Sequence, residues 1–227
     1  MPLLTNCVEK DSAVRSADKD VFHAYMVNGA RFSGTFDFPI LERCIVDVEG
    51  LVSFPDAVSR KNTDFNKTVH FFVDDFRFER FWNNPHKYLD KLKKFSAVIE
   101  PDFSTCPNFP MALKIYNMYR NRACAYWLQK NGVHVIPNIR CETDNFDWAL
   151  EGIPKGGTIA IGSNGCIKKC FNRARFVASL KSAVNEVQPS NIIVYGSDAF
   201  GVLDYPRSLG IKVDVFPSEA FNHSRGD

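Results

Sequence analysis

Residues 158–165 read TIAIGSNG, a short apolar run that ends in a polar turn containing glycine. Apolar residues then recur at helical spacing from Ile167 onward, and this pattern stops before Pro189. A second apolar run, Asn191–Tyr195, follows directly. A strand, a helix and another strand in this order form the basic unit of a parallel sheet. The stretch therefore predicts a βα architecture.

The same alternation of apolar runs and helical segments extends over the chain from about residue 40 onward. The predicted strands are Arg43–Val48, Val69–Asp74, Ala97–Glu100, Val133–Asn138, Thr158–Gly162, Asn191–Tyr195 and Lys212–Phe216. Most of them are continuously apolar, which is typical of strands that are covered on both faces. Two further helices are predicted, one beginning at Asn84-Pro85 and one running from Pro110 to Asn131-Gly132.

Successive parallel strands with helices between them fit two architectures of the α/β class. One is a small or incomplete TIM-like (βα) barrel built from parallel βα units, and the other is an open doubly wound sheet. No G-x-G-x-x-G motif follows the first strand, so the barrel is the preferred prediction. Residues 41–227 are expected to form a single α/β domain, because no repeat and no linker rich in Pro, Gly or Ser interrupts them. Residues 1–40 show neither period, which predicts an irregular amino-terminal arm or cap.

The composition is that of a globular protein, with 45% hydrophobic and 24% charged residues in a chain of 227. Its 28 basic and 26 acidic residues give a net charge of +2, so no global charge attracts nucleic acid or an anionic membrane. No apolar run approaches the roughly 18 residues that cross a bilayer, and the first residues lack a signal peptide. The seven cysteines are scattered singly, without a C-x-x-C pair, as reduced thiols are. We therefore expect a cytoplasmic protein with no membrane partner.

Polar residues follow most of the predicted strands, at the edge where ligands bind in both architectures. Two neighbouring strands are followed by the carboxylates Asp74, Asp75, Glu100 and Asp102. We predict these four as catalytic residues, because carboxylates brought together divide acid and base roles between them. Carboxylates also hold divalent cations, so Asp74 and Asp102 are candidate ligands of Mg²⁺ or a similar ion. The alternative is structural, because aspartates at strand ends also cap helices and pair with arginines such as Arg77.

A second candidate site is the turn that follows the strand at 158–162. It consists of Gly162, Ser163, Asn164 and Gly165. Free backbone N–H groups and the helix dipole favour an anion at such a turn, and Lys168 follows in a segment without acidic residues. We predict that the turn and Lys168 bind a phosphate group. The alternative is an ordinary βα turn beside a solvated basic face, because no G-K-S/T sequence follows it.

Three residues at other strand ends complete the predicted ligand-binding set: Asn138, Arg140 and Tyr195. The helical segment Lys114–Lys130 combines basic and aromatic residues, a mixture that also occurs in nucleic-acid-binding proteins. Its aromatic residues fall on the apolar stripe, which favours packing in the core over base stacking. His70 lies inside an apolar run and is expected to be a core histidine.

Several segments resemble, in order, the motifs of one known family: Phe71–Trp82, Glu100–Ser104, Arg120–Arg122, Val135–Asn138, Glu151–Gly156 and Ile193–Gly196. Over about residues 40–217 the chain resembles DUF4417, a family of unknown function. The resemblance implies a protein of a bacterium, a phage or a mobile element. It carries over no catalytic residue, because the family has no established activity.

Two functional hypotheses follow. The first is an intracellular enzyme that acts on a phosphorylated or nucleotide-like small molecule in a polar pocket at the carboxyl ends of the strands. In it, the carboxylates hold a cation or transfer protons, Arg140 balances anionic charge and the turn at 162–165 binds phosphate. The second is a non-catalytic module of a phage or mobile element that binds a nucleotide, nucleic acid or a host protein. Carboxylates gathered around a cleft favour the first hypothesis, and splayed carboxylates favour the second.

Overall fold

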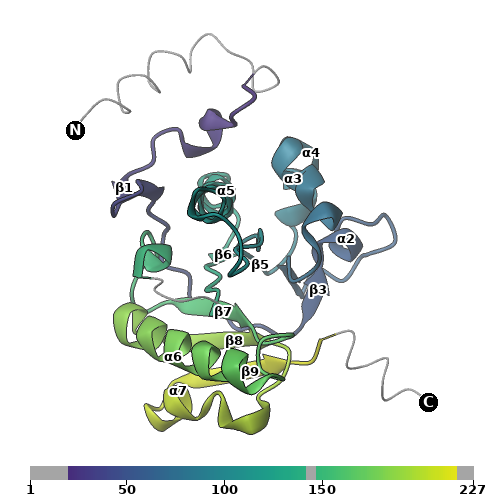
Figure 1. Ribbon diagram of the computed structural model, residues 1–227. Coiled ribbons are helices and arrows are strands. Elements are labelled where there is room, and N and C mark those ends of the chain that lie inside the picture. Colours follow the sequence, from purple (N-terminus) through teal and green to yellow (C-terminus); the bar gives the residue numbers. More distant parts are fainter. Residues whose placement is uncertain (1–19, 142–146, 219–227) are drawn as a thin grey trace.

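The structure is a computed structural model that describes residues 20–141 and 147–218 (Figure 1). Two parallel ladders form its framework. The first has the order β3 (Leu51–Ser53), β4 (Thr68–His70), β5 (Ala97–Ile99) and β6 (Val135–Ile136). The second has the order β7 (Thr158–Gly162), β8 (Asn191–Tyr195) and β9 (Lys212–Phe216). A parallel bridge between Asn138 and Ala160 links the two ladders.

Helices connect most of these strands. The long ones are α5 (Met111–Lys130) and α6 (Cys170–Val187), and the short ones are α2 (Phe54–Ala57), α3 (Glu79–Asn83), α4 (His86–Leu92) and α7 (Asp204–Ser208). Four 3₁₀ turns, η2 (Ala24–Val27), η3 (Asp75–Arg77), η4 (Asp147–Leu150) and η5 (Ala199–Gly201), complete the described connections. Pro110 precedes α5, and the helix ends before Gly132, whose φ of +83° suits glycine. The predicted helices thus correspond to α4, α5 and α6.

Strand residues alternate between two environments. In the second ladder, Ile159 and Ile161 pack against α6 residues such as Leu180. In the first, Val69 and Val98 belong to the cluster built with α3, α4 and α5. Figure 1 shows α6 and α7 together on one side of β7, β8 and β9. Each ladder therefore packs against helices on one face.

The opposite faces of the two ladders share a single apolar cluster, whose buried members are Cys44, Ala97, Ile99, Ile136, Ala160 and Ile193. Because both ladders contribute to it, the strands curl around a common interior. No ladder joins β9 back to β3 among the described residues, so the curled sheet stays open. The α/β class with parallel βα units is confirmed, and the open sheet is consistent with the strand pairing.

Three predicted strands need correction. One of them, Val133–Asn138, is shortened to β6, Val135–Ile136. Arg43–Val48 is not a strand but an extended segment across the start of β7, where Cys44 O accepts a 2.8 Å hydrogen bond from Thr158 N. The strand predicted at Val69–Asp74 ends at His70, because Val73 N bonds to Phe71 O and turns the chain. Asp74 therefore precedes η3 instead of ending a strand.

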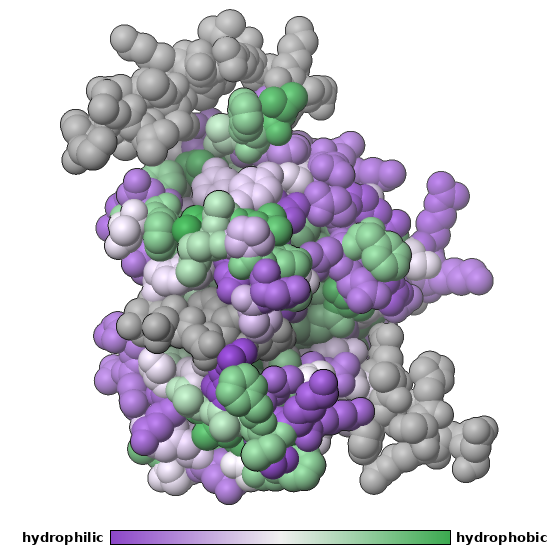
Figure 2. Space-filling model, in the orientation of Figure 1, coloured by the Kyte–Doolittle hydropathy of each residue, from purple (hydrophilic) through white to green (hydrophobic). Residues whose placement is uncertain are grey.

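The segment predicted as an irregular arm lies partly outside the described residues, which begin at residue 20. Its described part contains η2 and the two-residue strands β1 (Phe32–Ser33) and β2 (Phe38–Pro39), which pair in an antiparallel ladder. Phe38 is fully buried and packs with Met118 of α5. On the face seen in Figure 2, hydrophilic residues surround small apolar areas, as is usual for a globular surface.

Candidate ligand-binding site

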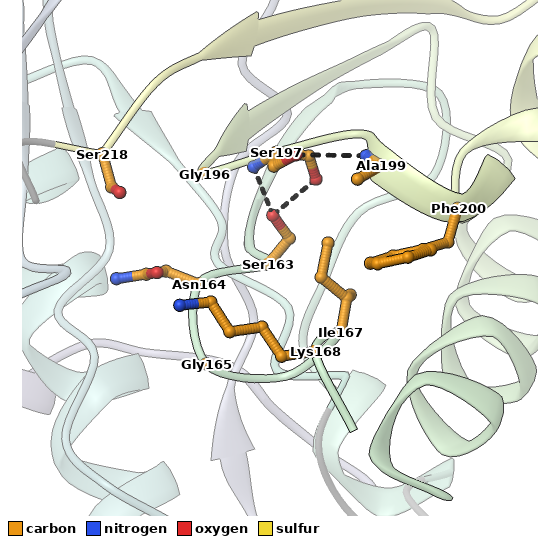
Figure 3. A pocket seen from close by; sticks show the side chains of 10 residues that line it. All are labelled: Ser163, Asn164, Gly165, Ile167, Lys168, Gly196, Ser197, Ala199, Phe200 and Ser218. Carbon is orange, nitrogen blue, oxygen red and sulfur yellow. Dashed lines mark hydrogen bonds between the residues drawn. The ribbon is translucent and has the colours of Figure 1, made fainter. Parts of the chain in front are cut away.

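A pocket of about 310 Å³ lies at the carboxyl ends of β7, β8 and β9 (Figure 3). Its described lining comes from the segments 163–168 and 196–200 and from Ser218. Parallel strands carry their carboxyl ends at one edge, so three segments that are distant in sequence meet there. The turn predicted to bind phosphate thus lies on a pocket, with Ser163, Asn164, Gly165 and Lys168 in its lining.

A short link between two connections shapes this pocket. Ser163 is fully buried, and its Oγ donates to Ser197 O and accepts from Ser197 N, both at 2.8 Å. Gly196 has a φ of +133°, and a Cβ on it would lie 2.4 Å from Ser163 Oγ. Glycine is required there by its backbone conformation and by the close approach of the neighbouring turn. The link fixes the connection after β8 against the turn after β7.

Polar groups without protein partners face this pocket. Ser218 is 5% exposed, yet its hydroxyl forms no hydrogen bond with any residue that the structure describes. Figure 3 shows this side chain at the rim, beside Asn164. Within the described chain, no residue accepts a hydrogen bond from the backbone N–H of Asn164 or Gly165. Asn164 and Gly165 are exposed, so their N–H groups are open to solvent or to a ligand in the pocket.

The electrostatic environment of the pocket is positive. Lys168 is exposed at its edge, and none of the described lining residues is Asp or Glu. α6 begins two residues after Lys168 with no side-chain cap and no acidic residue in its first turn. The unpaired N–H groups at a helix start carry partial positive charge. The arrangement suits an anion.

The predicted catalytic carboxylates are not part of this pocket, and Glu100 is held in an ion pair with Arg122 of α5. Both side chains are buried, and Arg122 Nη1 lies 2.6 and 2.5 Å from the two carboxylate oxygens of Glu100. Asn138 N adds a 2.9 Å bond to Glu100 Oε2. Burial raises the pKa of the Glu100 carboxyl, and the Arg122 guanidinium and the Asn138 N–H act in the opposite direction.

Asp102, Asn138 and Arg140 form the adjoining part of the same network. Asp102 Oδ1 pairs with Arg140 Nη1 at 2.7 Å and accepts from Asn138 Nδ2 at 2.6 Å. Arg140 Nη1 also donates to the backbone oxygen of Asp102 at 3.0 Å. Asp102 was predicted as a catalytic and metal-binding residue, and Asn138 and Arg140 as ligand-binding residues. In the structure these three side chains bind one another.

The remaining aspartates lie apart from this network. Asp75 accepts hydrogen bonds from the backbone N and the Oγ of Ser104, at 3.1 and 3.0 Å. Asp74 is exposed and makes no capping bond to η3. Among the described residues, no three His, Cys, Asp or Glu side chains come close enough to hold a metal ion. The catalytic and metal-binding roles of these carboxylates stay predictions.

Tyr195 and Gly162 have packing neighbours in the curled interior. The Tyr195 ring stacks on Phe72 at 5.2 Å and lies 4.5 Å from His70, centroid to centroid. A Cβ on Gly162 would lie 3.2 Å from the Phe72 ring. These contacts connect the first ladder with the second across the shared cluster. Neither residue lines the pocket as the described residues define it.

His70 is a core residue, and its burial predicts a pH effect on stability. Burial lowers its pKa to about 4, against a usual value near 6.5. Between about pH 6.5 and pH 4, the unfolded chain binds a proton that the folded chain does not, so acidification favours unfolding. One pKa unit corresponds to about 1.4 kcal/mol, so we expect this imidazole to remove about 3 kcal/mol of stability across that range.

Urea unfolding at pH 7 and pH 4.5 checks this effect. His70→Asn keeps an acceptor for Phe72 N, which bonds to His70 Nδ1 at 3.2 Å, and cannot titrate. We expect the variant to lose clearly less stability on acidification than the parent protein. Equal losses in both proteins would show that His70 is not responsible.

Sequence reasoning missed three side chains that matter here. Arg122 follows Ile115 by seven residues on the apolar stripe of α5, and a charge at that position signals a buried partner. Phe200 and Ser218 lie in connections without periodic pattern, where no sequence signal points to a pocket. Arg120 is also largely buried and pairs with Glu79 at 2.9 Å, so neither arginine is available at the α5 surface.

Comparison with known proteins finds phage relatives of this chain. Over 130 residues, 56% of this chain, it is 41% identical to the gene 1 protein of Mycobacterium phage L5 and 39% identical to that of Mycobacterium phage D29. The matches cover 56% and 48% of those proteins, so the chain spans about half the length of the curated relatives it matches. No helix in the described part of the chain has the length and apolar character needed to cross a membrane.

Among the solved structures that match is a GH138 enzyme targeting pectin rhamnogalacturonan II. The overlap has a TM-score of 0.39 and 11% identity, and it covers 85% of this chain and 28% of that one. Similarity at this level assigns no activity. A family model described as a domain of unknown function (DUF4417) matches residues 30–206, beginning within the arm that the sequence resemblance left out. Since this match covers most of the sequence, the chain belongs to the DUF4417 family.

Proposed function

We propose that this chain is a binding module for a small phosphorylated molecule, which it holds in the pocket at the carboxyl ends of β7, β8 and β9. The observation that carries the proposal is Ser218, a residue that is 5% exposed, lines the pocket and has no hydrogen-bond partner for its hydroxyl in the described chain. Lys168 and the open N–H groups of Asn164 and Gly165 add donors around the same space. Donors without competing carboxylates favour an anionic ligand.

Binding is preferred to catalysis because of the side chains in the lining. The described lining contains no Asp, Glu, His or Cys, so it offers no group suited to proton transfer near neutral pH. The hydroxyl of Ser163 is engaged by Ser197 on both its donor and its acceptor side. Glu100 and Asp102, which the enzyme hypothesis uses, are bonded to Arg122 and Arg140.

Titration calorimetry with inorganic pyrophosphate tests the proposal. We expect saturable binding that Lys168→Gln weakens about 5- to 10-fold at low salt, because one charged hydrogen bond is lost. The reduction should shrink at high salt, since exposed charges are screened there. Lys181→Gln is the matched control: it removes the same charge from α6, where Lys181 lies 5.1 Å from the Tyr205 ring, outside the lining.

Ser218→Ala provides an independent check. Because the hydroxyl has no partner in the described chain, its removal should leave the free energy of unfolding nearly unchanged while weakening pyrophosphate binding. Absence of binding to the parent protein at low salt would refute the proposal. Equal effects of Lys168→Gln and Lys181→Gln would also refute it.

A further inference from the structure

The pocket has an aromatic wall that a phosphate group alone does not need. Phe200 lines it from η5 and is 66% exposed. Figure 3 shows its ring next to Ile167, on the side of the pocket away from Ser218. An exposed phenylalanine in the wall of a pocket can offer a π-face to a ligand.

Two features hold this ring in place. The Arg173 guanidinium lies 4.3 Å from the ring centroid, so one face of the ring is covered by a cation. The backbone of Phe200 has a φ of +66°, a left-handed conformation that is unfavourable for a bulky residue. Strained backbone that persists in a connection often serves a ligand site. Because Arg173 covers one face and the residue is 66% exposed, we infer that the other face of the ring is accessible.

We propose that the phosphorylated ligand is a mononucleotide whose base stacks on the open face of Phe200, while its phosphate lies at the turn of Ser163, Asn164 and Gly165. The inference rests on the proposed phosphate binding. It identifies the rest of that ligand as a nucleoside. The pocket volume of about 310 Å³ is near the lower end for small-molecule sites, which fits one nucleotide better than a longer ligand. Stacking on an aromatic ring accepts any base, because every base has a π-face.

The experiment compares ribose 5-phosphate with the 5′-monophosphates of adenosine, guanosine, cytidine and uridine, all measured by titration calorimetry. At least one nucleotide should bind about 10-fold more tightly than ribose 5-phosphate, which is within the range for one stacked base. In Phe200→Leu the ratio of the ribose 5-phosphate Kd to the nucleotide Kd should fall to near one, because leucine keeps an apolar side chain but has no π-face. In Phe200→Trp the ratio should persist.

The control variant is Tyr205→Leu, which removes an aromatic ring from α7 outside the described lining. Its ratio of affinities should equal that of the parent protein. Equal binding of ribose 5-phosphate and all four nucleotides would overturn the nucleotide inference and leave phosphate binding intact. If pyrophosphate and ribose 5-phosphate both fail to bind, the proposed function falls as well. Tight binding of a single-stranded oligonucleotide without binding of any mononucleotide would also overturn the inference.

Discussion

Replacing Arg122 by leucine is expected to lower the free energy of unfolding by about 3–5 kcal/mol, the usual cost of breaking a buried ion pair from one side. Arg122 is fully buried and Glu100 is 1% exposed. Without Arg122, the N–H of Asn138 is the one hydrogen-bond donor to the Glu100 carboxylate that remains among the described residues. Because burial already raises the pKa of this carboxyl and the Arg122 guanidinium opposes that effect, we expect the pKa of Glu100 to rise further in the variant.

The double variant Glu100→Gln/Arg122→Leu shows how much of the stability lost in Arg122→Leu is due to the unpaired charge of Glu100 and how much to the lost packing of the Arg122 side chain. Because the buried carboxylate of the pair is gone, the double variant should recover part of the stability that Arg122→Leu loses. Urea unfolding of the parent protein, the two single variants and the double variant measures the coupling. Lys155→Leu is the control, because Lys155 and Glu186 form an exposed pair with side chains 60% and 64% exposed. Exposed pairs contribute about 0–1 kcal/mol. A loss in Arg122→Leu no larger than in this control would contradict the structural role of the pair.

The result bears on function as well as on stability. Glu100 was a predicted catalytic residue because it follows a buried strand at the edge where ligands bind. A carboxylate whose removal mainly destabilises the fold belongs to the scaffold instead. The same reasoning extends to Asp102, which is held by Arg140 and Asn138.

The sequence predicts the strand bounds of the second ladder more accurately than those of the first. β7, β8 and β9 have the predicted bounds, because each is a five-residue run that pairs along its whole length. β4 and β6 have only three and two residues. Their apolar runs continue into turns and into the interior cluster, so hydrophobicity does not mark where pairing ends. That is why Asp74 was placed at a strand end.

Of the candidate site, the turn after β7 could be predicted from the sequence, but the roles of Gly196, Phe200 and Ser218 could not. The turn after β7 was found because a strand, a glycine-containing turn and a helix follow one another directly in the chain. Gly196 comes directly after β8, and its requirement for glycine depends on Ser163, which is brought near only by pairing of β7 with β8. Phe200 and Ser218 enter the pocket only through the fold as a whole. Contacts between distant connections are not encoded in local periodicity.

The close approach of Gly196 and Ser163 predicts a large loss of stability when Gly196 is replaced. Gly196→Ala should lower the free energy of unfolding by about 2–4 kcal/mol, which combines backbone strain with overpacking. The new Cβ would lie 2.4 Å from Ser163 Oγ and 3.0 Å from Asn164 N. One of the two connections has to move, so pyrophosphate binding should be lost as well. Urea unfolding and calorimetry measure the two losses on the same preparation.

Gly210→Ala is the matched control, because Gly210 also has a positive φ, +75°, but nothing lies within 4 Å of the position that a Cβ would take there. It should show the cost of backbone strain alone, about 1 kcal/mol, and should bind pyrophosphate normally. Adding Ser163→Ala to Gly196→Ala removes the closest atom. The double variant should then lose less stability than the sum of the two single losses, although the contact with Asn164 N keeps the recovery partial. If Gly196→Ala lowers the free energy of unfolding no more than Gly210→Ala does, the connections after β7 and β8 are not held in a fixed position relative to one another. The turn after β7 would then have no fixed position from which to hold a phosphate.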